Sequence, residues 1–97
     1  MHTISELKDR LTPIFQNNHI KQAILFGSYA KQLADTGSDV DILIDSEGRL
    51  RGIDFFGVLD EISSVLSVPV DLIERSQVQA GGRIEQEIKE AGVVLYG

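Results

Sequence analysis

The segment DVDILID at residues 39–45 alternates between acidic and apolar side chains. Successive side chains of an extended strand point to opposite faces. A strand over Val40–Asp45 therefore has one face that is wholly apolar and must pack against other elements. The opposite face receives the remaining side chains, which are Asp39, Asp41, Leu43 and Asp45. Any fold for this chain has to bury the first face and account for the acids on the second.

A length of 97 residues corresponds to one small domain, and we expect it to cover residues 1–97. The chain contains no cysteine, which excludes disulfides, thiolate zinc sites and cysteine nucleophiles. Its apolar runs are far shorter than the roughly 20 residues that cross a bilayer, and the N-terminus lacks the pattern of a signal peptide. We expect a cytoplasmic protein without a membrane partner.

The charge balance bears on possible partners. Nine basic and fifteen acidic residues give a formal net charge of −6. A protein that binds nucleic acid directly usually presents a basic face to the phosphates. We therefore do not expect direct nucleic-acid binding.

The residues before this strand predict helices and one further strand. Thr3 and Glu6 have the spacing of a capping box, so a helix is expected from Thr3. Pro13 disfavours an uninterrupted helix, which predicts a break near Leu11–Thr12 and a second short helix to about Asn18. The next expected elements are a strand over Gln22–Phe26, a short helix over Tyr29–Leu33 and a turn over Asp35–Ser38.

The residues after the strand predict a loop at 46–52 and then a helix capped by Asp54. The expected apolar stripe of that helix is Phe55, Phe56, Leu59, Ile62 and Leu66. Further along, we expect a strand over Val70–Ile73, a helix over 82–91 and an edge strand over Val93–Tyr96. The helix over 82–91 would turn Ile84, Ile88 and Ala91 inward and pair Glu85 with Lys89 on its outer side.

This order of elements predicts the α/β (α+β) class, with a small mixed sheet and helices packed against one face. The other face would be open, and Asp39 and Asp41 would point from it.

Three features suggest that the acids have a function, and the first is that Asp39 and Asp41 share one face at the start of a rigid, β-branched run. An isolated D-x-D is often only a pair of solvated acids, and that reading stays open for these two residues. Asp71, however, lies within another apolar strand, where a lone carboxylate is costly. Gly27 and Ser28 form a strand–turn–helix junction whose backbone N–H groups suit a phosphate. Three carboxylates and a phosphate cradle fit a pair of Mg²⁺ ions and transfer at a nucleotide phosphate.

Other motifs fail on spacing. The chain lacks the G-x-x-x-x-G-K-[ST] of a P-loop, and Phe26 stands where a nucleophile elbow at Ser28 would need glycine. An EF-hand beginning at Asp35 would need glycine where Val40 stands. The two histidines, His2 and His19, have no ligand spacing and are expected at the surface.

Gly27-Ser28, ten intervening residues and Asp39-Val40-Asp41 together resemble the signature of the minimal nucleotidyltransferases of the DNA polymerase β superfamily. The later VDLI and the closing V-x-L-Y extend the resemblance to nearly the whole chain. It implies the polymerase β-like nucleotidyltransferase fold.

The resemblance also implies site residues. Asp39, Asp41 and Asp71 would be the catalytic, metal-binding carboxylates, and Gly27 and Ser28 would hold the triphosphate of ATP. The family commonly has arginine and then glycine where this chain has Lys31-Gln32. Lys31 keeps the positive charge and is expected at the nucleotide, without the planar fork of arginine. Arg49, Arg51 and Arg83 could also reach phosphate. The alternative for each of them is a solvated charge at the surface.

Many stand-alone proteins of this family are antitoxins paired with a helical ribonuclease toxin of the HEPN type. The resemblance thus implies a protein adenylyltransferase that attaches AMP from ATP to a tyrosine of the toxin. Two alternatives stay open: a binding module that neutralises its partner by contact alone, and a nucleotidyltransferase for small molecules.

Overall fold

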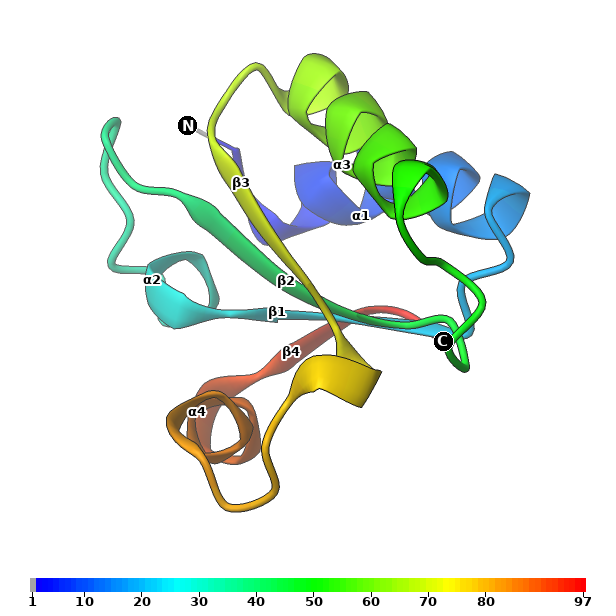
Figure 1. Cartoon of the computed structure of the whole chain (residues 1–97). Coiled ribbons are helices and arrows are strands. Elements are labelled where there is room, and N and C mark those ends of the chain that lie inside the picture. The colour runs from blue at the N-terminus through cyan, green and yellow to red at the C-terminus, as the bar shows by residue number, and fades with distance from the viewer. Residues whose placement is uncertain (1) are drawn as a thin grey trace.

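The computed structural model describes residues 2–97 and is built around a four-stranded mixed sheet in the order β3-β2-β1-β4 (Figure 1). The strands are β1 (Gln22–Phe26), β2 (Val40–Asp45), β3 (Val70–Glu74) and β4 (Val93–Tyr96). β1 is antiparallel to β2 and β4, whereas β2 and β3 are parallel. The mixed sheet, its four strands and the edge position of β4 confirm the predicted fold class.

The helices are α1 (Ile4–Asn17), α2 (Gly27–Ala30), α3 (Ile53–Leu66) and α4 (Arg83–Ala91), with a 3₁₀ turn η1 over Arg75–Gln77. The capping box at Thr3 is present: Glu6 N–H donates to the Thr3 hydroxyl at 3.1 Å, and Thr3 N–H donates to the Glu6 carboxylate at 3.3 Å. No helix within residues 2–97 is both long enough and apolar enough to cross a membrane.

The predicted break near Leu11–Thr12 is wrong, because α1 runs without interruption through Pro13. Proline removes one N–H and its ring crowds the preceding turn. Buried side chains on both sides of it outweigh this cost: Leu7 and Leu11 precede Pro13, and Ile14 and Phe15 follow it. Tertiary packing therefore decides the course of this helix.

We predict that Pro13→Ala stabilises the protein by about 2 kcal/mol, because alanine favours a helix interior by about 3 kcal/mol and loses about 1 kcal/mol through the freer unfolded chain. Pro13 is exposed, so no packing is lost with its ring. Urea unfolding of the two proteins measures the difference. An unchanged midpoint would mean that the helix absorbs the proline without cost.

Two other helices differ from the expected boundaries. The short helix predicted over Tyr29–Leu33 begins two residues earlier, at Gly27, and ends at Ala30. In α3 the buried residues are Val58, Ile62 and Leu66, while Phe56 is 64% exposed. The cap predicted at Asp54 is wrong, because Gly52 precedes the first turn of α3 and Asp54 lies within that turn. The predicted stripe holds except at Phe56, whose place in the core is taken by Val58.

The sheet has an apolar cluster on each face. The larger one joins Val40, Ile42 and Ile44 of β2 to α1 and α3. The smaller one consists of Ile24, Phe26 and Leu43, and Ile84 and Ile88 of α4 pack against it. The expectation that all helices lie on one face was therefore wrong for α4, which lies on the side of the sheet opposite α1 and α3 (Figure 1).

This second cluster exists because three apolar side chains point from the same face of the sheet as Asp41, which is called the acid-bearing face below. Leu43 follows the period-2 pattern of β2 and is only 2% exposed. Burying it requires a cover, and the strongly amphipathic α4 supplies one. The acid-bearing face is thus apolar and covered by α4 over part of its area, and Asp41 and Asp71 lie near the beginnings of β2 and β3.

Candidate active site

The candidate site lies where the first residues of β2 and β3 meet. Asp41 and Asp71 are direct partners in the parallel ladder between these strands. Neighbouring strands are about 4.8 Å apart, and partners in register point to the same face. Leu43 and Ile73, two residues further along each strand, both belong to the smaller apolar cluster and confirm that face. The sheet thus places two carboxylates side by side.

Gly27 completes the site from the other neighbouring strand. Phe26, the last residue of β1, is the antiparallel partner of Asp41, so Gly27 follows directly beside that carboxylate. Gly27 has φ +72°, and a Cβ at this position would lie 2.1 Å from Oδ2 of Asp41. Any other residue would collide with the carboxylate. Both the backbone conformation and the contact explain why glycine occurs here.

Asp39 lies in the loop just before β2 and is exposed. The described residues contain no group of three His, Cys, Asp or Glu side chains already arranged around a point where a metal could lie. Asp39 nevertheless acts electrostatically on Asp41 together with Asp71. Carboxylate oxygens gathered near the beginnings of β2 and β3 are the hard donors that Mg²⁺ prefers, together with water and substrate phosphates.

Asp41 shows the cost of gathering these charges. Partial burial raises its pKa from the ordinary 3.8 to about 6, and repulsion by Asp71, Asp39 and Glu87 adds to the shift. The positive charge of Arg83 acts in the opposite direction. A bound cation would remove much of this repulsion. The three aspartates therefore fit the Mg²⁺ ions that were predicted from the sequence.

A pH dependence of stability follows for the metal-free protein. The folded state holds a proton on Asp41 up to about pH 6, whereas the unfolded chain releases it near 3.8. The stabilisation is therefore fully present below the lower value and is lost as the pH rises through the higher one. Urea unfolding in the presence of a chelator should show this loss in wild type and not in Asp41→Asn. Equal pH profiles for the two proteins would contradict the raised pKa.

Ser28 and Lys31 lie on and after α2. Ser28 is half-buried in its first turn, and no side chain within residues 2–97 caps that turn. Lys31 is exposed, and its backbone N–H donates to the Gly27 carbonyl at 3.2 Å. Gln32 has φ +58°, a left-handed conformation that costs a non-glycine residue about 1–2 kcal/mol. This backbone explains why glycine is common at that position in the family that the sequence resembles.

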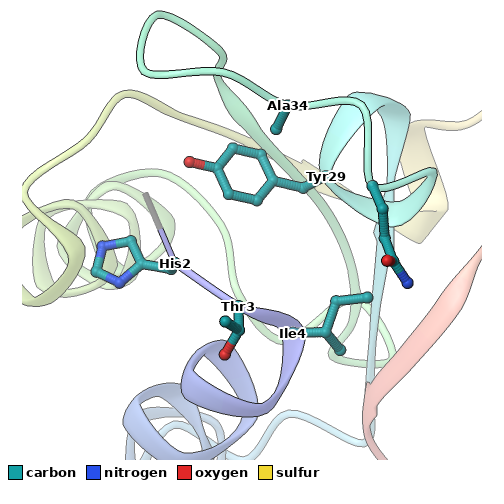
Figure 2. Close-up of a pocket in the computed structure, with 6 residues that line it drawn as sticks. His2, Thr3, Ile4, Tyr29 and Ala34 are labelled. Atoms are coloured by element: carbon teal, nitrogen blue, oxygen red, sulfur yellow. The ribbon is translucent and has the colours of Figure 1, made fainter.

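A pocket of about 310 Å³ lies near α2 but does not contain the acids. Figure 2 shows Tyr29 pointing into it, toward His2, with Thr3, Ile4 and Ala34 around it. Tyr29 belongs to the larger apolar cluster, on the face opposite Asp41. His2 is held at this side of the molecule by a 2.7 Å hydrogen bond to the Leu66 carbonyl. This pocket is therefore separate from the candidate site.

Two residues near the acids were not identified from the sequence as a pair. Arg83 and Glu87 lie one turn apart on α4 with a 3.5 Å ion pair, and both charges act on Asp41. Their i, i+4 spacing was visible, but nothing in the sequence indicated that α4 would lie beside β2.

Glu74 was also missed, and its role is structural. It is 3% exposed and accepts hydrogen bonds from the Ser46 N–H, the Ser46 hydroxyl and the Ser76 N–H. These bonds join the ends of β2 and β3.

Comparison with known proteins identifies the family. Residues 9–97 match the family described as "Polymerase beta, Nucleotidyltransferase". The chain belongs to this nucleotidyltransferase family. Among curated relatives, a provisionally named protein adenylyltransferase of Methanocaldococcus jannaschii is 30% identical over 82 residues, covering 80% of this chain and 95% of the relative. The protein adenylyltransferase MntA of Thermococcus cleftensis is 29% identical, covering 84% of this chain and 86% of MntA.

Two solved toxin–antitoxin structures share the fold. A toxin–antitoxin complex with AMP-PNP matches with a TM-score of 0.80 and 23% identity, over 93% of this chain and 73% of the other. An MNT antitoxin in complex with the tri-AMPylated HEPN toxin of Shewanella oneidensis matches with a TM-score of 0.75 and 21% identity, over 98% and 73% of the two chains. These likenesses confirm the nucleotidyltransferase fold.

Proposed function

We propose that this chain is a Mg²⁺-dependent protein adenylyltransferase that transfers AMP from ATP to a tyrosine hydroxyl group of a HEPN-type toxin and thereby acts as its antitoxin. The observation that carries the proposal is the pairing of Asp41 with Asp71, with Gly27 packed against the Asp41 carboxylate. The names of the relatives agree with it: curated relatives are protein adenylyltransferases, and one structural neighbour is an antitoxin bound to an AMPylated toxin.

The residues have distinct roles in this proposal. Asp39, Asp41 and Asp71 would hold the magnesium, two ions in the full site. When bound, the metal neutralises charge and acts as a Lewis acid at the transferred phosphate. Gly27 and Ser28 would donate backbone N–H groups to the triphosphate, and Lys31 would add a positive charge.

The chemical step is an in-line displacement at the α-phosphorus. Asp71 orients the acceptor hydroxyl and accepts its proton. The acceptor oxygen forms a bond to the α-phosphorus, the bond to the bridging oxygen breaks, and pyrophosphate leaves. In this proposal, the paired carboxylates at the beginnings of β2 and β3 would lie beside this phosphate. Use of ATP agrees with the cytoplasmic location that we predict from the sequence.

Intact-mass measurement of the HEPN-type partner tests the proposal. Incubation with this chain, ATP and Mg²⁺ should add one or more AMP units and inactivate the partner's ribonuclease activity. The matched control replaces ATP with its α,β-methylene analogue, whose α–β bridge cannot be cleaved in this way. Inhibition that is equally strong with the analogue, at unchanged partner mass, would show a contact-only binding module. AMP transfer to small molecules, without any transfer to the partner, would indicate a nucleotidyltransferase for small molecules.

A further inference from the structure

The ion pair between Arg83 and Glu87 lies on α4, and Arg83 is one of the three arginines that the sequence offers as candidates for phosphate binding. Ile84 and Ile88 fix α4 on the acid-bearing face by packing against Phe26 and Leu43. α4 also contacts α2, the helix that begins at Gly27. α4, whose first residue is Arg83, is therefore held on the acid-bearing face and against α2.

The negative charges around Asp41 would repel the triphosphate of a nucleotide, so a positively charged side chain at this place would favour its binding. Asp39, Asp71 and Glu87 all act as negative charges on Asp41. Arg83 is a positive charge that acts on the same carboxylate. A nucleotide triphosphate brings further negative charge, and arginine binds phosphate strongly through its planar fork.

Arg83 is free to change partner. Its side chain is 79% exposed, and its 3.5 Å contact with Glu87 is a single surface ion pair, which contributes little energy. It also borders an open pocket of about 260 Å³, formed with residues of the loop before α4. Space is therefore present beside the guanidinium.

The other candidate arginines lie elsewhere. Arg49 lines a pocket with His19 and the first turns of α3. Arg51 donates to the Gly48 carbonyl at 2.8 Å and borders a different pocket with Glu74. Neither is among the charges that act on Asp41.

We propose that Arg83 binds the β- and γ-phosphates of the nucleotide, the part that leaves as pyrophosphate, and that Glu87 positions its guanidinium until the nucleotide displaces it. This inference rests on the proposed function for the identity of the ligand. It assigns the leaving group to α4, while the paired carboxylates act at the α-phosphate. Arg83 thereby supplies the arginine fork that Lys31 lacks.

Calorimetric titration of the full chain with ATP and with AMP, both in Mg²⁺, tests the assignment without a toxin. A charge-assisted phosphate contact is expected to make ATP binding of Arg83→Ala weaker by about tenfold or more. AMP binding should change by less than about twofold, because AMP lacks the outer phosphates. Arg83→Lys should recover part of the ATP affinity, and Glu87→Gln should raise it.

Arg10→Ala is the matched control. Arg10 is an exposed arginine on α1, the helix on the opposite face, and its removal should leave both affinities unchanged. Wild-type ATP affinity in Arg83→Ala, or equal losses for ATP and AMP, would overturn the assignment. Full recovery by lysine would also overturn the proposed fork-like contact.

The two proposals fail separately. Arg83-dependent ATP binding without AMP transfer to the toxin would support this assignment and refute the proposed function. AMP transfer together with unchanged ATP affinity in Arg83→Ala would do the reverse.

Discussion

Asp41→Asn is expected to abolish AMP transfer, with a loss of about a thousandfold or more, equivalent to about 4 kcal/mol of transition-state stabilisation. Asparagine keeps the shape of the side chain but removes the central negative charge of the site. Asp41 is the carboxylate that lies against Gly27 and pairs with Asp71, and its pKa is shifted by the charges of its neighbours. The intact mass of the partner after incubation with ATP and Mg²⁺ gives the measurement.

The same substitution should not destabilise the fold. It removes a partly buried charge that three neighbouring acids repel, so the metal-free variant should be at least as stable as wild type at neutral pH. Thermal unfolding provides this check and separates lost chemistry from lost structure. Asp45→Asn is the matched control, because Asp45 lies at the far end of the same strand. Near wild-type transfer by Asp41→Asn would remove this residue from the catalytic set.

Gly27→Ala is expected to reduce both transfer and stability. The methyl group would meet Oδ2 of Asp41 at 2.1 Å, and the backbone has φ +72°. The carboxylate must therefore move, and misplacement by about 1 Å typically costs about a hundredfold in rate. Strain at this left-handed position should lower the free energy of unfolding by about 1–3 kcal/mol. Urea unfolding and the mass assay measure the two effects.

Gly57→Ala is the matched control for this change. Gly57 lies within α3, and a Cβ there would meet nothing within 4 Å. Alanine should stabilise that helix by up to about 1 kcal/mol and leave AMP transfer unchanged. If Gly27→Ala were as active and as stable as Gly57→Ala, the close packing of Gly27 against Asp41 would have no functional importance.

The strands were predictable because their signals are local. The alternation over Val40–Asp45 is enough to assign β2 and to separate its two faces. Gly27-Ser28 marked the end of β1. The spacing from this pair to Asp39 and Asp41 indicated transfer at a nucleotide phosphate. The capping box at Thr3 involves residues only three positions apart and was equally visible.

The errors concern interactions between segments that are distant in sequence. Pro13 predicted a break, but the packing of buried residues on both sides of it keeps α1 continuous. The exposure of Phe56 follows from how α3 docks on the sheet, which local hydrophobicity does not specify.

The sequence by itself determined the strands, the acid-bearing face and the family signature, because these depend on the periodicity and spacing of nearby residues. The tertiary structure alone decided that Asp71 is the register partner of Asp41, that Gly27 lies against its carboxylate and that α4 brings Arg83 and Glu87 to the same place. Strand register and helix docking depend on burying apolar surface across the whole chain. No single segment of the sequence specifies that arrangement.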